Sequence, residues 1–369
     1  MKTKYTRWAG AAVFLVLWAA LTALLWFSPA KEHSDAERRK LKQFPQLSLQ
    51  SLWDGSYMDQ FEEAAPDQFP MREEFRAAKA LFRYYALGQA DNNGIYLREG
   101  YAAKILYPLN KEAVSQNLEK LQTFYELYLK DTDCKLYAAV IPDKNFYLGA
   151  QYGYPTMEYD EMFSMVQNGL PWAEHVDLTG SLDISDYYFT DIHWRQENLM
   201  ETAQLLSQAM GVTPPEEADF TKVKVESPFY GVYHGQAALP MKPDTMYLMM
   251  NEMLENCIVT VHDDNSKVEV YDLQKLDSKD LYDIYLSGSR TMVEIVNPNA
   301  KTDRELVIFR DSFGSSIAPL LLRDYAKVTL LDLRYVMDSK MIGKMLRLND
   351  QDVLFLYSTE VLNTPNQLR

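Results

Sequence analysis

The sequence has few of the residues that build metal centres and disulfide frameworks. Its 369 residues include two cysteines, Cys134 and Cys257, and five histidines. Two cysteines cannot form a cysteine-rich zinc site or a network of disulfides. Their separation permits a bridge between them, but we expect two buried thiols, because a free cysteine behaves as a small apolar residue.

Basic residues are also in the minority. The chain has 37 Lys and Arg against 52 Asp and Glu, which gives a formal net charge of −15. An acidic surface repels the phosphate backbone, so the composition argues against nucleic-acid binding. The hydrophobic fraction of 47% excludes a mostly disordered chain. The length suits one large α/β domain or two ordinary ones.

Only one run of the sequence is apolar enough to cross a bilayer. Residues 9–27 carry no charge and follow Lys2, Lys4 and Arg7. As a helix this run spans about 28 Å, which is close to one hydrocarbon core. The positive flank predicts a single-pass cell-membrane protein with its carboxyl-terminal part outside the cytoplasm. The alternative is a cleaved signal peptide ending near residues 28–30, but the run is longer than the apolar region of such peptides.

The rest of the chain divides by composition. We expect a cytoplasmic tip and anchor over residues 1–30, a polar juxtamembrane linker over 31–60, and one main domain over 61–369. Short strand candidates separated by turns predict an insertion over 213–300.

The pattern of the main domain predicts a parallel sheet with helices on both faces. Apolar strands are expected at 135–142, 305–309, 327–333 and 352–358, and helices at 71–88, 111–130, 194–210, 314–325 and 339–348. Ligands of such folds bind at the carboxyl ends of the strands.

Ser312 follows one of these strands, in the segment Arg310-Asp311-Ser312-Phe313-Gly314. A serine on a turn at the start of a helix lies beside free N–H groups that can stabilise an oxyanion. This position suits a nucleophile, although the Gly-x-Ser-x-Gly pattern is absent. The alternative is that Asp311 or Ser312 only caps the helix.

A second cluster contains Asp191 and His193, just before the helix expected from Trp194. A serine nucleophile needs a base, and the base needs an orienting carboxylate. This pair supplies both types of group. The alternative is that Asp191 caps the helix and His193 is a structural histidine.

Other polar residues are weaker candidates. The pair His175 and Asp177 has no serine-bearing turn and is interpreted as structural, and the run His262-Asp263-Asp264 lacks further metal ligands and is interpreted as a solvated loop. His234, in a glycine-flanked loop, is a candidate substrate contact, and Lys144 is a candidate cleft residue.

The two clusters together resemble a known family. The segments are TDIHW, FRDSFG and LLDLRY, accompanied by NNGIYL, VIPDKNFY, HVDLTGSL and PFYGVYHG. They resemble the DHHW family, a branch of the SGNH-hydrolase-like proteins that includes the alginate O-acetyltransferases. The resemblance extends over most of residues 35–360.

The resemblance implies a three-layer, flavodoxin-like α/β fold of the SGNH type, permuted so that the Asp-x-His loop precedes the serine. It implies that Ser312 is the nucleophile, His193 the general base and Asp191 its orienting carboxylate. Arg334 matches a family arginine that would bind acetyl or substrate oxygens, and a surface salt bridge is its alternative role. The oxyanion hole would use the backbone N–H of Ser312 and of Gly314.

The sequence departs from the family pattern in three ways. Ile192 replaces the first histidine of the family motif, the GDS block is absent, and no asparagine is identifiable as an oxyanion donor. The first departure leaves the triad histidine in place, because that residue is the second histidine of the motif.

The resemblance therefore predicts a membrane-anchored, extracytoplasmic O-acetyltransferase that needs no metal and no soluble cofactor. Its acceptor would be a cell-wall or exported polysaccharide, and a membrane-bound O-acyltransferase would supply the acetyl group. Three alternatives remain: a carbohydrate acetyl esterase, a non-catalytic assembly protein of polysaccharide export, and a plain glycan-binding protein.

Overall fold

A computed structural model describes residues 2–336 and 342–369 of the chain. The contacts divide it into two compact units. The amino-terminal unit comprises residues 1–93 and 234–240, and the main unit comprises residues 94–233 and 241–369. The domain boundaries predicted at residues 30 and 60, and the insertion predicted at 213–300, stay predictions.

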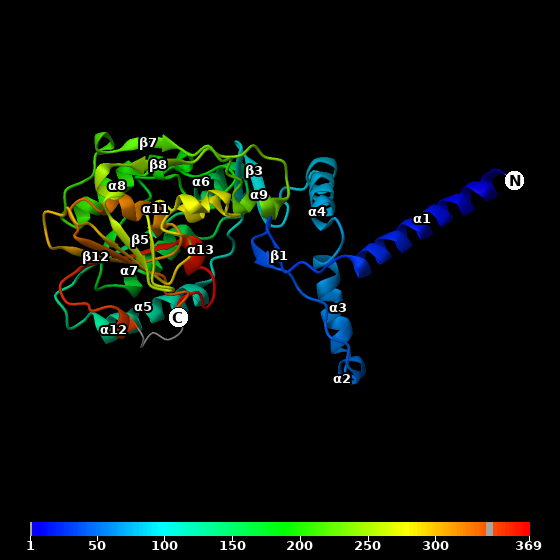
Figure 1. Cartoon of the computed structure of the whole chain (residues 1–369), viewed down its shortest axis with the longest axis horizontal. Helices are drawn as coiled ribbons and strands as arrows, with labels where there is room; N and C mark the ends of the chain where they lie inside the picture. Colours follow the sequence, from blue (N-terminus) through cyan, green and yellow to red (C-terminus); the bar gives the residue numbers. More distant parts are fainter. Residues whose placement is uncertain (1, 337–341) are drawn as a thin grey trace. The chain divides into compact units, whose positions relative to one another are not determined.

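The amino-terminal unit is mostly helical (Figure 1). Its elements are α1 (Lys2–Phe27), β1 (His33–Ser34), β2 (Arg39–Lys40), α2 (Leu49–Trp53), α3 (Ser56–Asp67), α4 (Arg72–Leu81) and the π-helical turn η1 (Phe82–Ala86). Within α1, Trp8–Phe27 has a mean hydropathy of 2.2 and contains no buried residue. This helix is long and apolar enough to cross a membrane, and a signal sequence has the same properties.

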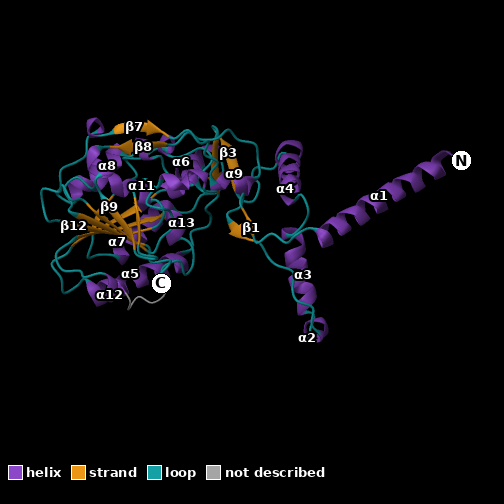
Figure 2. Ribbon diagram, viewed as in Figure 1, coloured by secondary structure: helices purple, strands orange, loops and turns teal. Residues whose placement is uncertain are grey.

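The main unit is built on an eight-stranded sheet (Figure 2). Its spatial order is β10 (Ser266–Val268), β9 (Ile258–Val261), β11 (Met292–Val296), β13 (Lys327–Leu331), β12 (Glu305–Arg310), β14 (Asp352–Ser358), β5 (Lys135–Ile141) and β6 (Glu174–Val176). The five strands from β13 to β6 are parallel. Two antiparallel strand pairs lie outside this sheet, β3 (Ile95–Arg98) with β4 (Tyr101–Lys104) and β7 (Thr221–Lys224) with β8 (Tyr247–Met250).

The other three strands of the sheet are antiparallel, so the sheet is mixed, and the predicted parallel arrangement holds for the five strands from β13 to β6. The strands β9 and β10 are joined by a short turn at residues 262–265. Antiparallel neighbours can be joined this way, whereas parallel neighbours need a long crossover. All three antiparallel strands come from the segment 213–300, where no helix pattern was predicted.

Helices cover both faces of the sheet. On one face lie α5 (Lys111–Tyr128), α7 (Tyr159–Gly169), α12 (Ile342–Met345) and α13 (Thr359–Leu362), and on the other lies α8 (Met200–Ala209). Shorter helices are α6 (Lys144–Leu148), α9 (Val232–Ala237), α10 (Glu252–Glu255), α11 (Gly314–Ile317) and the 3₁₀ turns η2 (Ala150–Tyr152), η3 (Ile184–Asp186), η4 (Gln196–Asn198), η5 (Glu217–Asp219), η6 (Leu273–Asp277), η7 (Leu281–Ile284) and η8 (Ala318–Leu321). In β12, Leu306 and Ile308 face one helical layer, and Val307 and Phe309 face the other, as the two-residue period of a strand requires. The predicted α/β class with a covered sheet is therefore confirmed.

Two predicted helices differ from the structure. The helix expected over 314–325 is the short α11 followed by the 3₁₀ turn η8, because Pro319 lacks the N–H that an α-helix would use. The helix expected from Trp194 begins at Met200, since Trp194 pairs with Tyr187 in a β-bridge. Of the helix predicted at 339–348, residues 339–341 lie outside the described residues.

Candidate active site

Ser312 lies on a turn at the carboxyl end of β12. The side chain of Asp311 shapes this turn by accepting the N–H of Phe313 (3.1 Å) and the N–H of Ser358 at the end of β14 (2.8 Å). Asp311 therefore organises the turn, while the N-cap position of α11 is Phe313, which has no side-chain cap. The half-buried Ser312 keeps its hydroxyl for another partner.

The Asp-x-His loop reaches this turn from the edge of the sheet. The edge strand β6 ends at Val176, and β5 and β14 lie between it and β12. The loop that follows is tied to the end of β5 by two bonds. The Tyr187 hydroxyl donates to the carbonyl of Pro142 (2.5 Å), and Lys144 Nζ donates to the carbonyl of Tyr188 (2.8 Å). These bonds hold the loop along the carboxyl ends of the strands.

The loop and the turn form one chain of hydrogen bonds. Ser312 Oγ lies 2.7 Å from His193 Nε2, and His193 Nδ1 lies 2.5 Å from Asp191 Oδ1. Asp191 is fully buried and His193 is 6% exposed. When Nδ1–H donates to the carboxylate, Nε2 is left as the acceptor for the serine proton. This is the geometry of an activated serine.

A third segment, residues 228–233, supports the carboxylate. The N–H of Val232 donates to Asp191 Oδ2 (2.8 Å), and the N–H of Gly231 donates to Thr190 Oγ1 (2.8 Å). A Cβ at Gly231 would lie 2.2 Å from the Cβ of Asp191, so only glycine allows this approach. In the sequence, the segment PFYGVYHG suggested only His234 as a candidate substrate contact, and Gly231 was not predicted to support the carboxylate. Its glycine between aromatic residues was the available signal.

A tyrosine ring covers one face of the imidazole. The rings of Tyr282 and His193 are parallel, with centroids 3.8 Å apart and planes 7° apart. The Tyr282 hydroxyl bonds to Ser316 Oγ (2.7 Å), which also accepts Trp194 Nε1–H (2.8 Å). Tyr282 comes from the predicted insertion, and no local pattern distinguishes it from the other 24 tyrosines.

The two expected oxyanion donors differ in their partners. The N–H of Gly314 donates to the carbonyl of Asp311 (3.2 Å) and is therefore engaged within the turn. Gly314 has a packing role instead, since a Cβ there would lie 2.6 Å from the Cβ of Arg310. Within the part of the chain that the structure describes, the N–H of Ser312 donates to no protein acceptor.

Arg334 lies just beyond the carboxyl end of β13. Its Nε and Nη2 donate to the two carboxylate oxygens of Asp332, at 2.9 and 2.6 Å. Asp332 is fully buried, and its carboxylate lies 3.8 Å from Arg310 Nη1. Arg334 thus pairs with a buried carboxylate and not at the surface, and its contact with acetyl or substrate oxygens stays a prediction.

The remaining candidates have structural contacts. His175 Nε2 bonds to the carbonyl of Leu170 (2.9 Å), and the Asp263 carboxylate accepts the N–H of Thr291 (3.1 Å). Among the described residues, no three metal-binding side chains converge. Lys144 is buried, which lowers its pKa to about 7, and it holds the Asp-x-His loop instead of lining an open cleft. His234 belongs to the amino-terminal unit.

Neither cysteine forms a disulfide. Cys134 and Cys257 are free, and both are half-buried. Burial raises the pKa of the Cys257 thiol to about 11.

No family model matches the chain, and no curated protein matches it in sequence. Solved structures do match. A DHHW family protein from Eubacterium siraeum aligns with a TM-score of 0.61 and 19% identity, over 75% of this chain and 94% of its own. PatB1 of Bacillus cereus aligns with a TM-score of 0.59 and 17% identity, over 74% and 98%. A second structure of PatB1, with a sulfonyl adduct, gives a TM-score of 0.58 and 17% identity, over 73% and 95%. The resemblance to the DHHW family is thereby confirmed at the level of the fold.

Proposed function

We propose that the main unit is a serine acyltransferase that moves an acetyl group to a hydroxyl of a polysaccharide outside the cytoplasm. The observation that carries this proposal is the continuous hydrogen-bond chain from Ser312 through His193 to Asp191. The fold shared with a DHHW family protein supports it. The acetyl group and the polysaccharide come from the motif resemblance to the family of the alginate O-acetyltransferases.

We also propose that the fold is circularly permuted. If the parallel strands are numbered from the serine-bearing strand as β12, β13, β14, β5 and β6, their spatial order reads 2-1-3-4-5. This is the flavodoxin-like order. In the chain, however, the fourth and fifth of these strands come first. The Asp-x-His loop thus follows the fifth strand in space and precedes the serine in sequence.

The first half of the reaction forms an acetyl-serine. His193 Nε2 takes the proton of Ser312 while Oγ attacks the acetyl carbonyl, and Asp191 stabilises the imidazolium through Nδ1–H. The N–H of Ser312 would donate to the tetrahedral oxyanion. The bond from the acetyl carbon to the donor oxygen then breaks, and His193 returns the proton to that oxygen.

The second half transfers the acetyl group. His193 removes a proton from a sugar hydroxyl, whose oxygen attacks the acetyl carbon of the acetyl-serine. The ester bond to Ser312 breaks, and the proton passes from His193 back to Oγ. Ser312, His193 and Asp191 return to their starting protonation states, so only the acetyl donor and the acceptor are consumed.

We propose that α1 is retained as an anchor that keeps the main unit at the outer surface of the cell membrane.

The test uses the full chain in neutral detergent with p-nitrophenyl acetate. We expect the wild type to release p-nitrophenol and to gain the mass of one acetyl group. Ser312→Ala should lose the adduct, and His193→Ala should lower turnover by about 10²- to 10⁴-fold. Methanesulfonyl fluoride should modify the wild type and not Ser312→Ala. If the folded variants equal the wild type in turnover and adduct, the assignment of Ser312 and His193 is wrong.

An oligosaccharide acceptor separates transfer from hydrolysis. With transfer, the acetyl group appears on the sugar, and release of free acetate falls as the acceptor concentration rises. If acetate release is unaffected by every acceptor, the protein is an esterase that uses water.

A further inference from the structure

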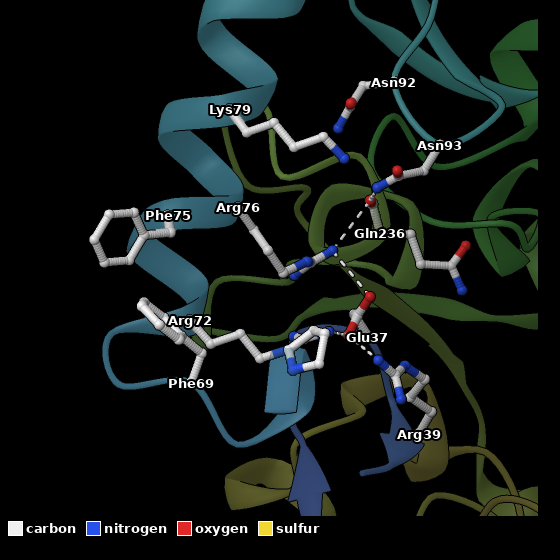
Figure 3. Close-up of a pocket in the computed structure, with 11 residues that line it drawn as sticks. Glu37, Arg39, Phe69, Arg72, Phe75, Arg76, Lys79, Asn92, Asn93 and Gln236 are labelled. Carbon is white, nitrogen blue, oxygen red and sulfur yellow. Dashed lines mark hydrogen bonds and ion pairs between the residues drawn. The ribbon is translucent and has the colours of Figure 1, made fainter. Parts of the chain in front are cut away.

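The amino-terminal unit contains a pocket of about 580 Å³ whose role the catalytic proposal does not explain (Figure 3). Its walls come from the segment around β2, from α4, from the turn at residues 92–93 and from residue 236. This volume is within the range of small-ligand pockets.

The pocket is rich in cations, although the chain as a whole is strongly acidic. Arg39, Arg72, Arg76 and Lys79 line it. The three arginines are fixed by buried or half-buried acids. Arg39 forms a bidentate pair with Asp67 at 2.8 and 2.6 Å, and Arg76 Nη2 donates to the carbonyl of Gly235 at 3.0 Å. Because these guanidinium groups are held before any ligand arrives, little side-chain entropy is lost on binding.

Lys79 differs from the arginines. Each arginine is paired with at least one of three acids, Glu37, Asp67 and Glu73. In one of these pairs, Arg72 Nη2 lies 2.5 Å from Glu37 Oε2. Among the described contacts, Lys79 has no ion pair and no hydrogen bond. Four cations against three acids leave a surplus of one positive charge, and Lys79 carries it. The pocket therefore attracts an anionic group.

A buried amide supplies the second, independent observation. Asn92 lines the pocket, is 2% exposed and donates its Nδ2–H to the carbonyl of Ala237 (2.8 Å). Its Oδ1 is buried without a hydrogen-bond partner. A buried acceptor left unpaired costs free energy, which a ligand hydroxyl would recover. In Figure 3 the ends of the Lys79 and Asn92 side chains turn toward the same space.

An apolar surface borders the charged one. The rings of Phe69 and Phe75 line the pocket and meet edge to face, with centroids 5.4 Å apart. Phe75 is 48% exposed. Such rings offer an apolar face to the C–H face of a sugar. An anion, hydroxyl donors and a C–H face occur together in an acidic sugar.

We infer that this pocket binds an acidic oligosaccharide, with Lys79 on its carboxylate or phosphate and Asn92 Oδ1 on a hydroxyl. The inference rests on the proposed function only in taking a polysaccharide as the acceptor. The pocket would then bind an acidic acceptor polymer, while the acyl transfer takes place at Ser312.

Calorimetry with the full chain in neutral detergent tests the inference. We expect either trigalacturonate, which carries carboxylates, or a glycerol phosphate oligomer, which carries phosphates, to bind. The oligomer that binds identifies the anionic group. Maltotriose, which is uncharged, should not bind. Lys79→Gln should weaken binding by about 3- to 10-fold, and raised salt should weaken it further. Lys120→Gln, which removes an exposed lysine of α5, should leave affinity unchanged. A polyacrylate oligomer should bind more weakly than trigalacturonate, because it has no hydroxyl for Asn92.

Three outcomes would overturn the inference. The first is that neither acidic oligomer binds, and the second is that Lys79→Gln and Lys120→Gln lose the same affinity for an acidic oligomer. The third is that only short-chain phosphatidylglycerol binds, which would assign the pocket to a lipid headgroup. Ser312→Ala should bind acidic oligomers like the wild type, and Lys79→Gln should keep the wild-type rate with p-nitrophenyl acetate. Failure of the pocket and failure of the proposed chemistry are therefore separate results.

Discussion

His193 is held on both ring nitrogens and on one ring face. Its Nδ1 contacts Asp191 Oδ1, its Nε2 contacts Ser312 Oγ, and the Tyr282 ring lies parallel to it. The two hydrogen bonds define the ends of the imidazole, but a ring can still rotate about the line that joins them. The stacked tyrosine blocks that rotation, so we interpret Tyr282 as a positioning residue.

Substitution of Tyr282 tests this interpretation. Tyr282→Leu removes the stacked ring, and we expect kcat to fall by about 3- to 10-fold, the worth of an aromatic pair. Tyr282→Phe keeps the ring and loses only the hydroxyl bond to Ser316, so its kcat should stay near the wild-type value. Steady-state kinetics with p-nitrophenyl acetate gives the comparison. Equal losses in both variants would contradict a role for the stack.

Lys144 makes folding stability depend on pH. Burial lowers its pKa from 10.5 to about 7, although the negative charges of Asp191 and Asp244 act in the opposite direction. The ring centroids of Tyr101 and Tyr233 lie 5.9 and 5.1 Å from Nζ. Between pH 7 and about 10.5 the unfolded chain therefore binds the proton more strongly than the folded chain. Since the unfolded state holds more protons there, this residue makes the protein more stable as pH rises through that window.

Lys144→Met should remove this dependence. The difference in unfolding free energy between wild type and variant is expected to change by about 1.4 kcal/mol per pH unit above pH 7, in favour of the wild type. Chemical denaturation at a series of pH values measures it. A difference that is constant from pH 7 to 10 would show that the Lys144 pKa is not lowered.

At the scale of elements, the site depends on three segments that meet above the carboxyl ends of the strands. The turn after β12 carries Ser312, the loop after β6 carries Asp191 and His193, and residues 228–233 cover the carboxylate. The last two segments approach so closely that there is no room for a side chain at Gly231. The carboxylate is thereby positioned by backbone groups of two segments.

Gly231→Ala should separate these segments. The added methyl group would lie 2.2 Å from Asp191 Cβ and 2.3 Å from its Cα, and overpacking of this kind costs about 1–3 kcal/mol. We expect a lower melting temperature together with a loss of turnover, measured by calorimetry and p-nitrophenyl acetate. Gly180→Ala is the matched control, because a Cβ there meets nothing within 4 Å. If the two variants have the same melting temperature and the same turnover, the close approach at Gly231 affects neither stability nor catalysis.

At the scale of the whole molecule, an apolar helix precedes an acidic globular part. The helix α1 presents exposed tryptophans at both ends of its apolar run, Trp8 at 70% and Trp26 at 67% exposure. Indole rings are favoured at the two interfaces of a bilayer. On this pattern we propose an anchor that stays attached.

The mass of the mature protein tests the anchor. Expressed from its own start, the chain should stay in the membrane pellet after a carbonate wash, and its intact mass should include residues 2–27. A soluble product that begins near residue 30 would instead identify the segment as a cleaved signal peptide. The catalytic proposal is unaffected by either result, because its residues all belong to the main unit.

Local patterns were sufficient for the strands and for the candidate triad. The strands at 135–142, 305–309, 327–333 and 352–358 were predicted correctly, because runs of apolar residues buried on both faces are a short-range signal. Asp191, His193 and Ser312 could be proposed because their motifs lie next to predicted element boundaries. Their contact across 119 residues was an inference until the fold placed them together.

Long-range packing produced what the sequence analysis missed. The pairing of β9 with β11, the stack of Tyr282 on His193 and the contact of Gly231 with Asp191 each join residues far apart in the chain. No periodicity or spacing within a segment reports such pairs, because they depend on which elements become neighbours. The pocket of the amino-terminal unit also depends on which elements become neighbours, because Lys79 and Asn92 belong to separate segments. Chemistry-bearing residue types can be recognised in a sequence, but their geometry follows from packing between distant segments.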